Sequence, residues 1–329
     1  MNNMRLPRLD YLEPGETGEL LELLGEMGDD CTILAGGTDV VPMLKRRNST
    51  ATHLVNIKKI LRLKEISYDD ENGIRIGPAV TLREIINNPV ISDKYPLLAK
   101  AAGSVGFNQL RNMATLGGNI CLDNKCIYFN QSAFWWKSRR DCFKRGGDIC
   151  YVVKGGNGCH ALSAADTVPA LISLGAELII EQRGRERRTL LEVFYSGDGG
   201  NPHWLDRNEV VTGILIPSPD RGWKEGFLKK SYRGSVDFAF ATLSLRLRIN
   251  GGVLNDARIA LNSVSTKPIR ARKTELYLRG KTLSDPTLRE AVRLLLKESM
   301  PLSVIGASAL VRSNTIEAIF IDLMEMIKN

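Results

Sequence analysis

The stretch "CTILAGGTDVVPMLKRR" (31–47) passes from an apolar run through a turn of small residues into a basic segment. The apolar run predicts a strand over 31–37, and the segment near 40–47 predicts a helix. Between them, "AGGTD" (35–39) would let the backbone approach a ligand closely and let successive amides bind an anion. The stretch has neither the GxGxxG pattern nor a P-loop lysine, so it could bind phosphate or form an ordinary strand-to-helix turn.

A second glycine-centred stretch, "ATLGGN" (114–119), follows about 80 residues later and is expected to form a loop within 111–121. Thr115 can donate a hydroxyl, Gly117 and Gly118 allow tight backbone geometry, and Asn119 offers both a donor and an acceptor. Two such loops in one domain could hold a pyrophosphate from both ends. One of them could still be only a turn.

Apolar periodicity outside these stretches predicts two domains, residues 1–219 and 223–329, with Pro217 to Gly222 as the boundary. The first domain divides into subdomains of about 1–58 and 59–219, with an insertion at about 122–160. Its expected helices cover 17–27, 81–88 (capped by Thr81), 96–105 and 166–175, and its expected strands cover 53–57, 73–80, 176–182 and 209–219. The second domain should contain strand pairs within 237–264 around a turn at 250–252, then helices near 286–298 and 314–327.

The overall composition excludes several classes of protein. Hydrophobic residues make up 43% and charged residues 25% of the 329 residues, which argues against disorder. The net charge is +8, but acidic residues are interleaved with the basic ones, so no nucleic-acid partner is expected. The longest apolar run, 167–180, is too short to span a bilayer, and residues 1–16 lack a signal-peptide core. A cytoplasmic protein without a membrane segment is predicted, and its thiols should stay reduced.

Four of the six cysteines lie within the insertion, separated by 15, 7 and 8 residues, and Cys121 precedes them. The absence of a C-x-x-C pair argues against zinc, whereas thiolates drawn singly from one loop suit a [4Fe–4S] cluster. A zinc-stabilised interaction module remains an alternative. Glycines could turn backbone amides toward sulfur, and aromatic side chains could shield a cluster or simply pack. These are Gly146, Gly147, Gly155, Gly156 and Gly158, and Phe134, Trp135, Trp136 and Phe143.

The remaining cysteines and histidines are expected to be structural. Cys31 should be a buried thiol on a strand. His160 directly follows Cys159, but a histidine in such a position is more often a structural residue of the surface or core, with its hydrogen bonds satisfied. The sequence contains no plausible Ser-His-Asp group and no paired acid and base carboxylates. The chain is therefore expected to hold cofactors, with no catalytic residue of its own.

Two segments, "LAGGTDVVPMLKRR" (34–47) and "RNMATLGGNIC" (111–121), resemble the FAD-binding loops of flavoprotein subunits in the xanthine dehydrogenase and carbon monoxide dehydrogenase family of molybdenum hydroxylases. The similarity continues through 164–180, 229–247 and 257–281. The fold that it implies is α+β. A two-part α/β FAD-binding domain of the vanillyl-alcohol oxidase and CO dehydrogenase flavoprotein type would precede a C-terminal α+β domain, a three-stranded sheet with helices.

The resemblance also implies site residues. Asp166 resembles an acid near the ribityl or ribose hydroxyls, although it could be only a helix N-cap. Lys229 resembles a lysine near the isoalloxazine, although it could be a solvated strand lysine. Asp237 resembles an acid that tunes access to the flavin. The implied FAD-binding set is Ala35, Gly36, Gly37, Thr38, Asp39, Thr115, Gly117, Gly118, Asn119, Asp166, Lys229 and Asp237.

The cysteine spacing, with "NQS-x-x-WW" (130–136), resembles the loop of the β subunits of 4-hydroxybenzoyl-CoA reductases, which carries an additional [4Fe–4S] cluster. This implies that the ligands are Cys126, Cys142, Cys150 and Cys159. Cys121 corresponds to a non-ligand cysteine, although Cys121 and Cys126 could exchange roles. The cysteine spacing bears on how electrons are transferred and does not indicate the substrate.

The function implied by this resemblance is electron transfer within a dimer of heterotrimers. A large subunit would carry molybdopterin and a small subunit two [2Fe–2S] clusters, while ferredoxin would donate the electrons. The complex would reductively dehydroxylate 4-hydroxybenzoyl-CoA to benzoyl-CoA on the large subunit. The alternative within the family is the FAD subunit of a hydroxylase or dehydrogenase that oxidises a heteroaromatic compound or an aldehyde.

Overall fold

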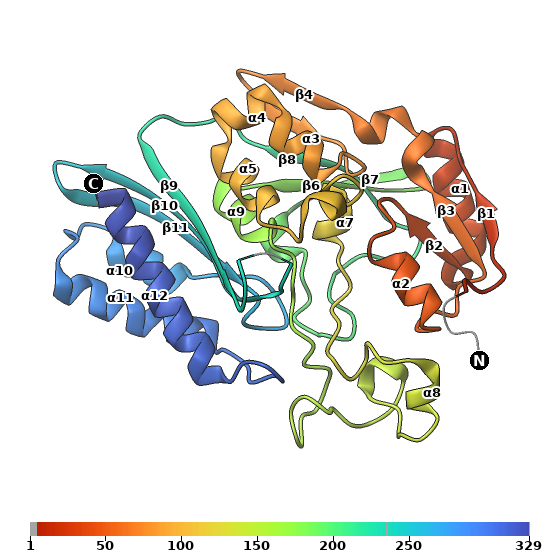
Figure 1. The fold of residues 1–329 in the computed structure, drawn as a ribbon. Coiled ribbons are helices and arrows are strands. Elements are labelled where there is room, and N and C mark those ends of the chain that lie inside the picture. The colour runs from red at the N-terminus through yellow and green to blue at the C-terminus, as the bar shows by residue number, and fades with distance from the viewer. Residues whose placement is uncertain (1–4, 235, 329) are drawn as a thin grey trace.

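The computed structural model describes residues 5–234 and 236–328, which form three sheets (Figure 1). The first is a parallel sheet in the order β1-β3-β2. Helix α1 covers it, with Leu20 and Leu24 packed in one cluster with Val55 and Ile57. Strand β2 ends at Leu34, earlier than predicted, and so leaves the glycine turn free of the sheet. The elements are β1 (Asp10–Leu12), α1 (Thr17–Met27), η1 (Gly28–Asp30), β2 (Cys31–Leu34), α2 (Val40–Lys45) and β3 (His53–Asn56).

A five-stranded antiparallel sheet in the order β4-β5-β8-β6-β7 follows. Its strands are β4 (Ile66–Asp69), β5 (Gly73–Ile76), β6 (Glu177–Gln182), β7 (Arg185–Leu190) and β8 (Val210–Ile216). Short helical segments connect them: η2 (Ile57–Lys59), η3 (Leu61–Lys64), α3 (Leu82–Asn87), α4 (Pro89–Lys94), α5 (Pro96–Gly103), α6 (Asn108–Arg111), α7 (Leu116–Ile120), α9 (Val168–Leu174) and η5 (Leu191–Val193). The predicted cap of α3 is confirmed, because Thr81 and Glu84 form a reciprocal capping box.

The insertion between α7 and α9 forms a separate lobe with little regular structure. It contains only α8 (Ala133–Trp136) and η4 (Phe143–Arg145). In Figure 1 this yellow-green segment extends from the body of the molecule, away from the sheets. Its position allows a long irregular segment without interrupting the three hydrophobic core clusters of the molecule.

The C-terminal region is an antiparallel sheet in the order β12-β11-β10-β9, covered by helices. The three long strands correspond to the predicted three-stranded sheet, and a two-residue strand extends it at one edge. The predicted turn at 250–252 is confirmed, with Gly251 and Gly252 both at positive φ. The elements are β9 (Trp223–Ser231), β10 (Ala239–Asn250), β11 (Val253–Asn262), β12 (Ile269–Arg270), α10 (Arg272–Leu278), α11 (Asp285–Ser299) and α12 (Ala309–Lys328). Within the described ranges, no helix is both long and apolar enough to cross a membrane.

Candidate functional site

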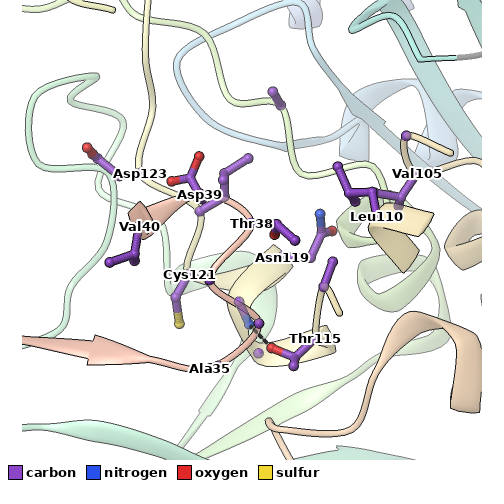
Figure 2. A pocket seen from close by; sticks show the side chains of 18 of the residues that line it. Ala35, Thr38, Asp39, Val40, Val105, Leu110, Thr115, Asn119, Cys121 and Asp123 are labelled. Carbon is purple, nitrogen blue, oxygen red and sulfur yellow. Dashed lines mark hydrogen bonds between the residues drawn. The ribbon is translucent and has the colours of Figure 1, made fainter. Parts of the chain in front are cut away.

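A cavity of about 400 Å³ lies between the two glycine stretches and the C-terminal sheet (Figure 2). We call it the glycine-loop pocket. All twelve residues that the sequence resemblance proposed for FAD line it, from Ala35 in the first stretch to Asp237 in the loop after β9. The volume falls within the range of small-molecule and cofactor sites. The chain therefore brings these distant segments together around one space.

The first glycine stretch packs directly against the second. A Cβ atom added at Gly36 would lie 2.1 Å from the backbone oxygen of Met113, so no other residue fits without moving one of the segments. Gly37 adopts a positive φ of 73°, which favours glycine. The glycines at these positions are thus needed for contact between two chain segments, in addition to any ligand.

The second glycine stretch is largely helical, and the expectation of a loop is wrong there. Thr115 caps the one-turn helix α7, its side chain accepting a hydrogen bond from the Gly118 amide at 3.1 Å. Gly117 permits contact with Pro78, since an added Cβ would lie 2.4 Å from the Pro78 Cβ. The Asn119 side-chain oxygen accepts hydrogen bonds from the Thr167 backbone amide at 3.1 Å and hydroxyl at 2.6 Å. Within the described part of the chain, the Asn119 side-chain nitrogen donates no hydrogen bond and is therefore available to a ligand.

Asp166 and Lys229 form a buried ion pair between the two halves of the molecule. The Lys229 Nζ lies 2.5 Å from the Asp166 Oδ2 and also donates to the Ser104 carbonyl oxygen at 3.0 Å. The two side chains are 7% and 11% exposed, so Lys229 is not a solvated lysine, and the N-cap of α9 is Thr167 rather than Asp166. Burial raises the pKa of the Asp166 carboxyl, and the nearby ammonium opposes this shift. The Asp166 Oδ1 is buried without a partner in the described residues and is available to a ligand donor.

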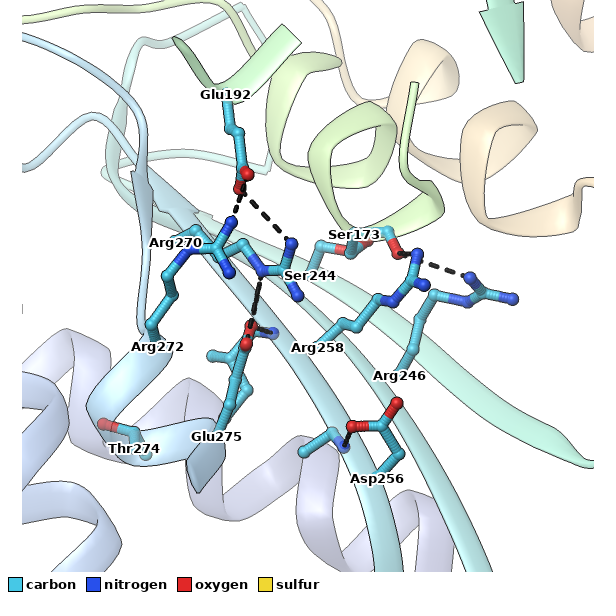
Figure 3. A network of polar contacts seen from close by, with 12 residues as sticks. Ser173, Glu192, Ser244, Arg246, Asp256, Arg258, Arg270, Arg272, Thr274 and Glu275 are labelled. Atoms are coloured by element: carbon cyan, nitrogen blue, oxygen red, sulfur yellow. Dashed lines mark hydrogen bonds and ion pairs between the residues drawn. The ribbon is translucent and has the colours of Figure 1, made fainter. Parts of the chain in front are cut away.

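Arginines from the C-terminal sheet also hold the two halves together (Figure 3). Arg246 and Arg258 are cross-strand neighbours, and both donate to the Ser173 carbonyl oxygen near the end of α9, at 3.3 and 3.4 Å. Positive charge is favourable at the C-terminus of a helix. Arg270 bridges Glu192 of η5 and Glu275 of α10. These contacts fix the sheet that carries Lys229 against the first domain.

The loop after β9 contributes Asp237 and two residues that sequence reasoning missed. The Asp237 carboxylate accepts a hydrogen bond from the Arg233 amide at 2.8 Å, and the Arg233 side chain holds the pKa of the carboxyl below its usual range. Val236 has a φ of 72°, which is strained for a β-branched residue, and Phe238 is 78% exposed at the pocket. The polar sequence around them carries no periodicity that would indicate either feature.

A second, smaller pocket lies inside the insertion, and we call it the cysteine pocket. Cys126, Cys142, Cys150 and Cys159 all line it. The Phe129 amide donates to the Cys126 sulfur at 3.3 Å, and the Val153 amide approaches the Cys150 sulfur at 3.5 Å. Burial raises the pKa of the Cys126 thiol and raises that of Cys159 to about 11. The sulfur-directed amides come from these residues rather than from the glycines that we expected.

The arrangement of the thiols differs from that of a single-ion site. Among the described residues, no three His, Cys, Asp or Glu side chains converge closely enough to hold one metal ion. The open space between the thiols is about 10 Å³, enough for roughly one water molecule, whereas the glycine-loop pocket has about 400 Å³. Four thiols around one space are the donor type that an iron–sulfur cluster takes, and the side chains would have to open to admit one.

Cys121 and Cys31 lie elsewhere. Cys121 lines the glycine-loop pocket, where burial raises the pKa of its thiol to about 12. The structure thus places Cys126, and not Cys121, with the other three cysteines. Cys31 begins β2 but is only partly buried, so the expectation of a buried thiol is wrong. The edge position of β2 in its sheet leaves that end accessible.

Aromatic side chains surround the cysteine pocket in two layers. Phe129, Phe143, Tyr128 and Tyr151 line it. Trp135 and Trp136 pack behind Tyr151, with ring centroids 6.3 and 6.0 Å from its ring. Phe134 is 77% exposed, so its expected shielding role is wrong, because the one-turn helix α8 directs it away from the buried Trp136. The His160 ring bonds the Gly158 carbonyl oxygen at 2.9 Å, a structural contact.

Comparison with known families gives matches over both domains. Residues 5–219 match the FAD binding domain in molybdopterin dehydrogenase, and residues 226–327 match the CO dehydrogenase flavoprotein C-terminal domain. The first match alone covers well over half of the chain and includes both glycine stretches and all four cysteines of the cysteine pocket.

Individual proteins resemble the chain over most of its length. The glyceraldehyde dehydrogenase medium chain of Sulfolobus acidocaldarius is 28% identical over 86% of this chain and 85% of its own. The carbon monoxide dehydrogenase medium chain of Hydrogenophaga pseudoflava is 28% identical over 87% and 85%, respectively. A solved structure, reconstituted CO dehydrogenase from Oligotropha carboxidovorans, superimposes with a TM-score of 0.82 at 23% identity and 99% coverage of both chains. The last similarity shows the fold, and the two family matches identify it as the CO dehydrogenase flavoprotein fold.

Proposed function

Because the chain belongs to the family of FAD-binding medium subunits of molybdopterin dehydrogenases, we propose that it transfers electrons through FAD and a [4Fe–4S] cluster within a molybdenum enzyme. The observation that carries the cluster proposal is the gathering of Cys126, Cys142, Cys150 and Cys159 around one small pocket. A flavin exchanges one or two electrons and an iron–sulfur cluster exchanges one, so the two groups together supply the redox chemistry.

The residues of the chain would hold these groups and set their surroundings. The glycine stretches offer backbone amides at the glycine-loop pocket, and the unpartnered Asp166 Oδ1 offers an acceptor. Lys229 supplies positive charge beside that acceptor. In the cysteine pocket, amides directed at two sulfurs would stabilise the reduced, more negative cluster. The domains 1–219 and 223–329 and a cytoplasmic location belong to the same proposal.

For the whole complex we propose 4-hydroxybenzoyl-CoA reductase activity, with ferredoxin as the electron donor. The partners would be a large molybdopterin subunit, where the substrate reacts, and a small subunit with two [2Fe–2S] clusters, arranged as a dimer of heterotrimers. The support is the cysteine spacing and the four-thiol pocket, because both suit an additional cluster.

A hydroxylating dehydrogenase of the same family is the second candidate. Relatives named for dehydrogenation of an aldehyde or a heteroaromatic compound favour it, such as the glyceraldehyde dehydrogenase medium chain and a nicotinate dehydrogenase FAD-subunit. Co-purification of the native complex followed by substrate assays separates the two. Reduction of 4-hydroxybenzoyl-CoA by reduced ferredoxin supports the first, and oxidation of an aldehyde or heteroaromatic compound with no such reduction supports the second.

The cofactor content of the anaerobically purified chain tests the core of the proposal. We expect a flavin absorbance band, about four irons per chain and matching acid-labile sulfide. Single replacement of Cys126, Cys142, Cys150 or Cys159 by Ser should remove the iron, and the matched control Cys121→Ser should retain it. A preparation with stoichiometric zinc, no flavin and no acid-labile sulfide would overturn the proposal in favour of a zinc-stabilised interaction module. Iron loss in Cys121→Ser but not in Cys126→Ser would overturn the ligand assignment.

A further inference from the structure

The glycine-loop pocket is rich in carboxylates for a site that accepts a dinucleotide. Among its described lining residues, four are acidic, and Lys229 is the only lysine or arginine. FAD carries a pyrophosphate, so every unpaired carboxylate nearby would oppose its binding. The acidic residues are Asp39, Asp123, Asp166 and Asp237. Lys229 and the backbone amides of the glycine stretches favour an anionic ligand, and cations from outside the lining would add to them by offsetting the carboxylate charges.

Each of the four carboxylates has a cation partner, and two of these partners come from the insertion. Lys229 pairs with Asp166, and Arg233 pairs with Asp237. Of the other two pairs, the Lys125 Nζ binds the Asp39 Oδ1 and so joins the insertion to the first glycine stretch, whereas the Lys144 Nζ lies 2.5 Å from the Oδ1 of Asp123, a pocket residue that is itself part of the insertion. In Figure 2, Asp39 and Asp123 both lie at the end of the pocket away from Val105 and Leu110.

The two insertion lysines are held in place rather than free in solvent. The side chains of Lys125 and Lys144 are 15% and 5% exposed. Lys144 also donates to the Gly199 and Gly200 carbonyl oxygens, at 3.2 and 3.1 Å, and lies 5.3 Å from the centre of the Phe129 ring. A partly buried pair is screened less by solvent and salt than an exposed one. The field of the two ammonium groups is therefore weakened less inside the glycine-loop pocket than that of exposed lysines would be.

Both lysines are also tied to the cysteine pocket. Lys125 immediately precedes Cys126, and Lys144 itself lines the cysteine pocket, two residues after Cys142. The course of the chain around the thiols thus determines where both ammonium groups lie. A change in the fold of the insertion would separate Asp39 from Lys125, and would displace Asp123 and Lys144 from each other.

We propose that Lys125 and Lys144 complete the flavin site electrostatically, so that assembly of the cysteine pocket and binding of FAD are thermodynamically coupled. The proposal rests on the proposed function, because it takes FAD and the cluster as the ligands of the two pockets. Coupling of this kind is reciprocal: a folded cysteine pocket raises the affinity for FAD, and bound FAD stabilises the cysteine pocket. Lys125 and Lys144 act here as positioning residues.

The decisive measurement is the dissociation constant of FAD for the full chain after removal of its flavin, in wild type and in Lys125→Met. We expect Lys125→Met to weaken binding about tenfold while iron content stays unchanged. Lys125→Arg, which keeps the charge, should bind almost as wild type does. The matched control is Lys154→Met, an exposed lysine of the same insertion that lines neither pocket, and it should have no effect.

A double-mutant cycle identifies the cause. If Lys125 acts by offsetting the Asp39 charge, Lys125→Met should have little further effect in an Asp39→Asn background. Equal FAD affinities of wild type and Lys125→Met would overturn the coupling and leave the proposed function intact. A wild-type chain that binds no FAD would instead overturn the proposed function. Should Lys125→Met fold poorly, wild type with its iron chelated provides the second test: coupling requires weaker FAD binding than in the iron-loaded chain.

Discussion

The glycine-loop pocket lies between regular elements of both domains, whereas the cysteine pocket lies within one irregular segment. Around the glycine-loop pocket, backbone contacts and a buried ion pair join segments that are far apart in sequence, such as Gly36 with Met113 and Asp166 with Lys229. Around the cysteine pocket, short turns present the thiols, and the Arg140–Asp148 pair of the insertion is exposed although Lys144 at the pocket is buried. The first pocket should therefore respond to packing and charge, and the second to its metal ligands.

The largest expected effect comes from the ion pair at the domain interface. Lys229→Met leaves the Asp166 carboxylate buried without its cation, and breaking such a pair typically costs about 3 kcal/mol or more. We expect a loss of unfolding free energy of this size in urea denaturation, together with weaker FAD binding. Lys230→Met is the control, because Lys230 is the exposed neighbour on the same strand. Similar stabilities of the two variants would show that the pair does not hold the domains.

The glycine stretches and the cysteine spacing could be recognised in the sequence because each is a local pattern. The capping box at Thr81 and the turn at Gly251 and Gly252 were predictable for the same reason. The partners across the fold could not be predicted. Asp166 and Lys229 are 63 residues apart, and Lys125 and Asp39 are 86 apart, so nothing in their local sequence indicates contact.

Two kinds of element escaped sequence reasoning. Strand β7, "RERRTL", reads as polar because it lies at the edge of its sheet, where charged side chains face solvent. The stretch "ATLGGN" reads as a loop because glycine disfavours helices, yet the Thr115 cap and the Pro78 contact make one turn of helix stable there. In both cases the neighbours in space outweigh the local propensity.

A matched pair of glycine substitutions sharpens the contrast between the pockets. Gly36→Ala places a Cβ 2.1 Å from the Met113 oxygen and should cost about 2 kcal/mol of unfolding free energy through overpacking, with reduced FAD affinity. Gly158→Ala lies in the insertion, where an added Cβ meets nothing within 4 Å, and should be neutral. Thermal unfolding and flavin titration measure both. If the two substitutions had equal effects, the close contact between Gly36 and Met113 would not be what distinguishes the two pockets.

The smallest expected effect is a difference between the two regions in how much their ion pairs contribute to the unfolding free energy as the pH changes. Arg187 donates two hydrogen bonds to Glu209, both at 2.7 Å, beside the strand that lines the glycine-loop pocket, and these hold the pKa of the Glu209 carboxyl below its usual range. A lowered folded-state pKa stabilises the protein above the unfolded value of about 4.3 and loses that contribution as pH falls through the folded value. Glu209→Gln should therefore reduce the unfolding free energy by about 1 kcal/mol at neutral pH, and the difference from wild type should shrink as the pH drops below about 4.

The control is Asp148→Asn in the insertion, which removes the partner of Arg140. The two side chains of that pair are 73% and 70% exposed, so solvent screens it and stability should stay unchanged at every pH. Urea titrations across this range measure both variants, and a pH-independent difference for Glu209→Gln would show that packing, rather than charge, accounts for its contribution.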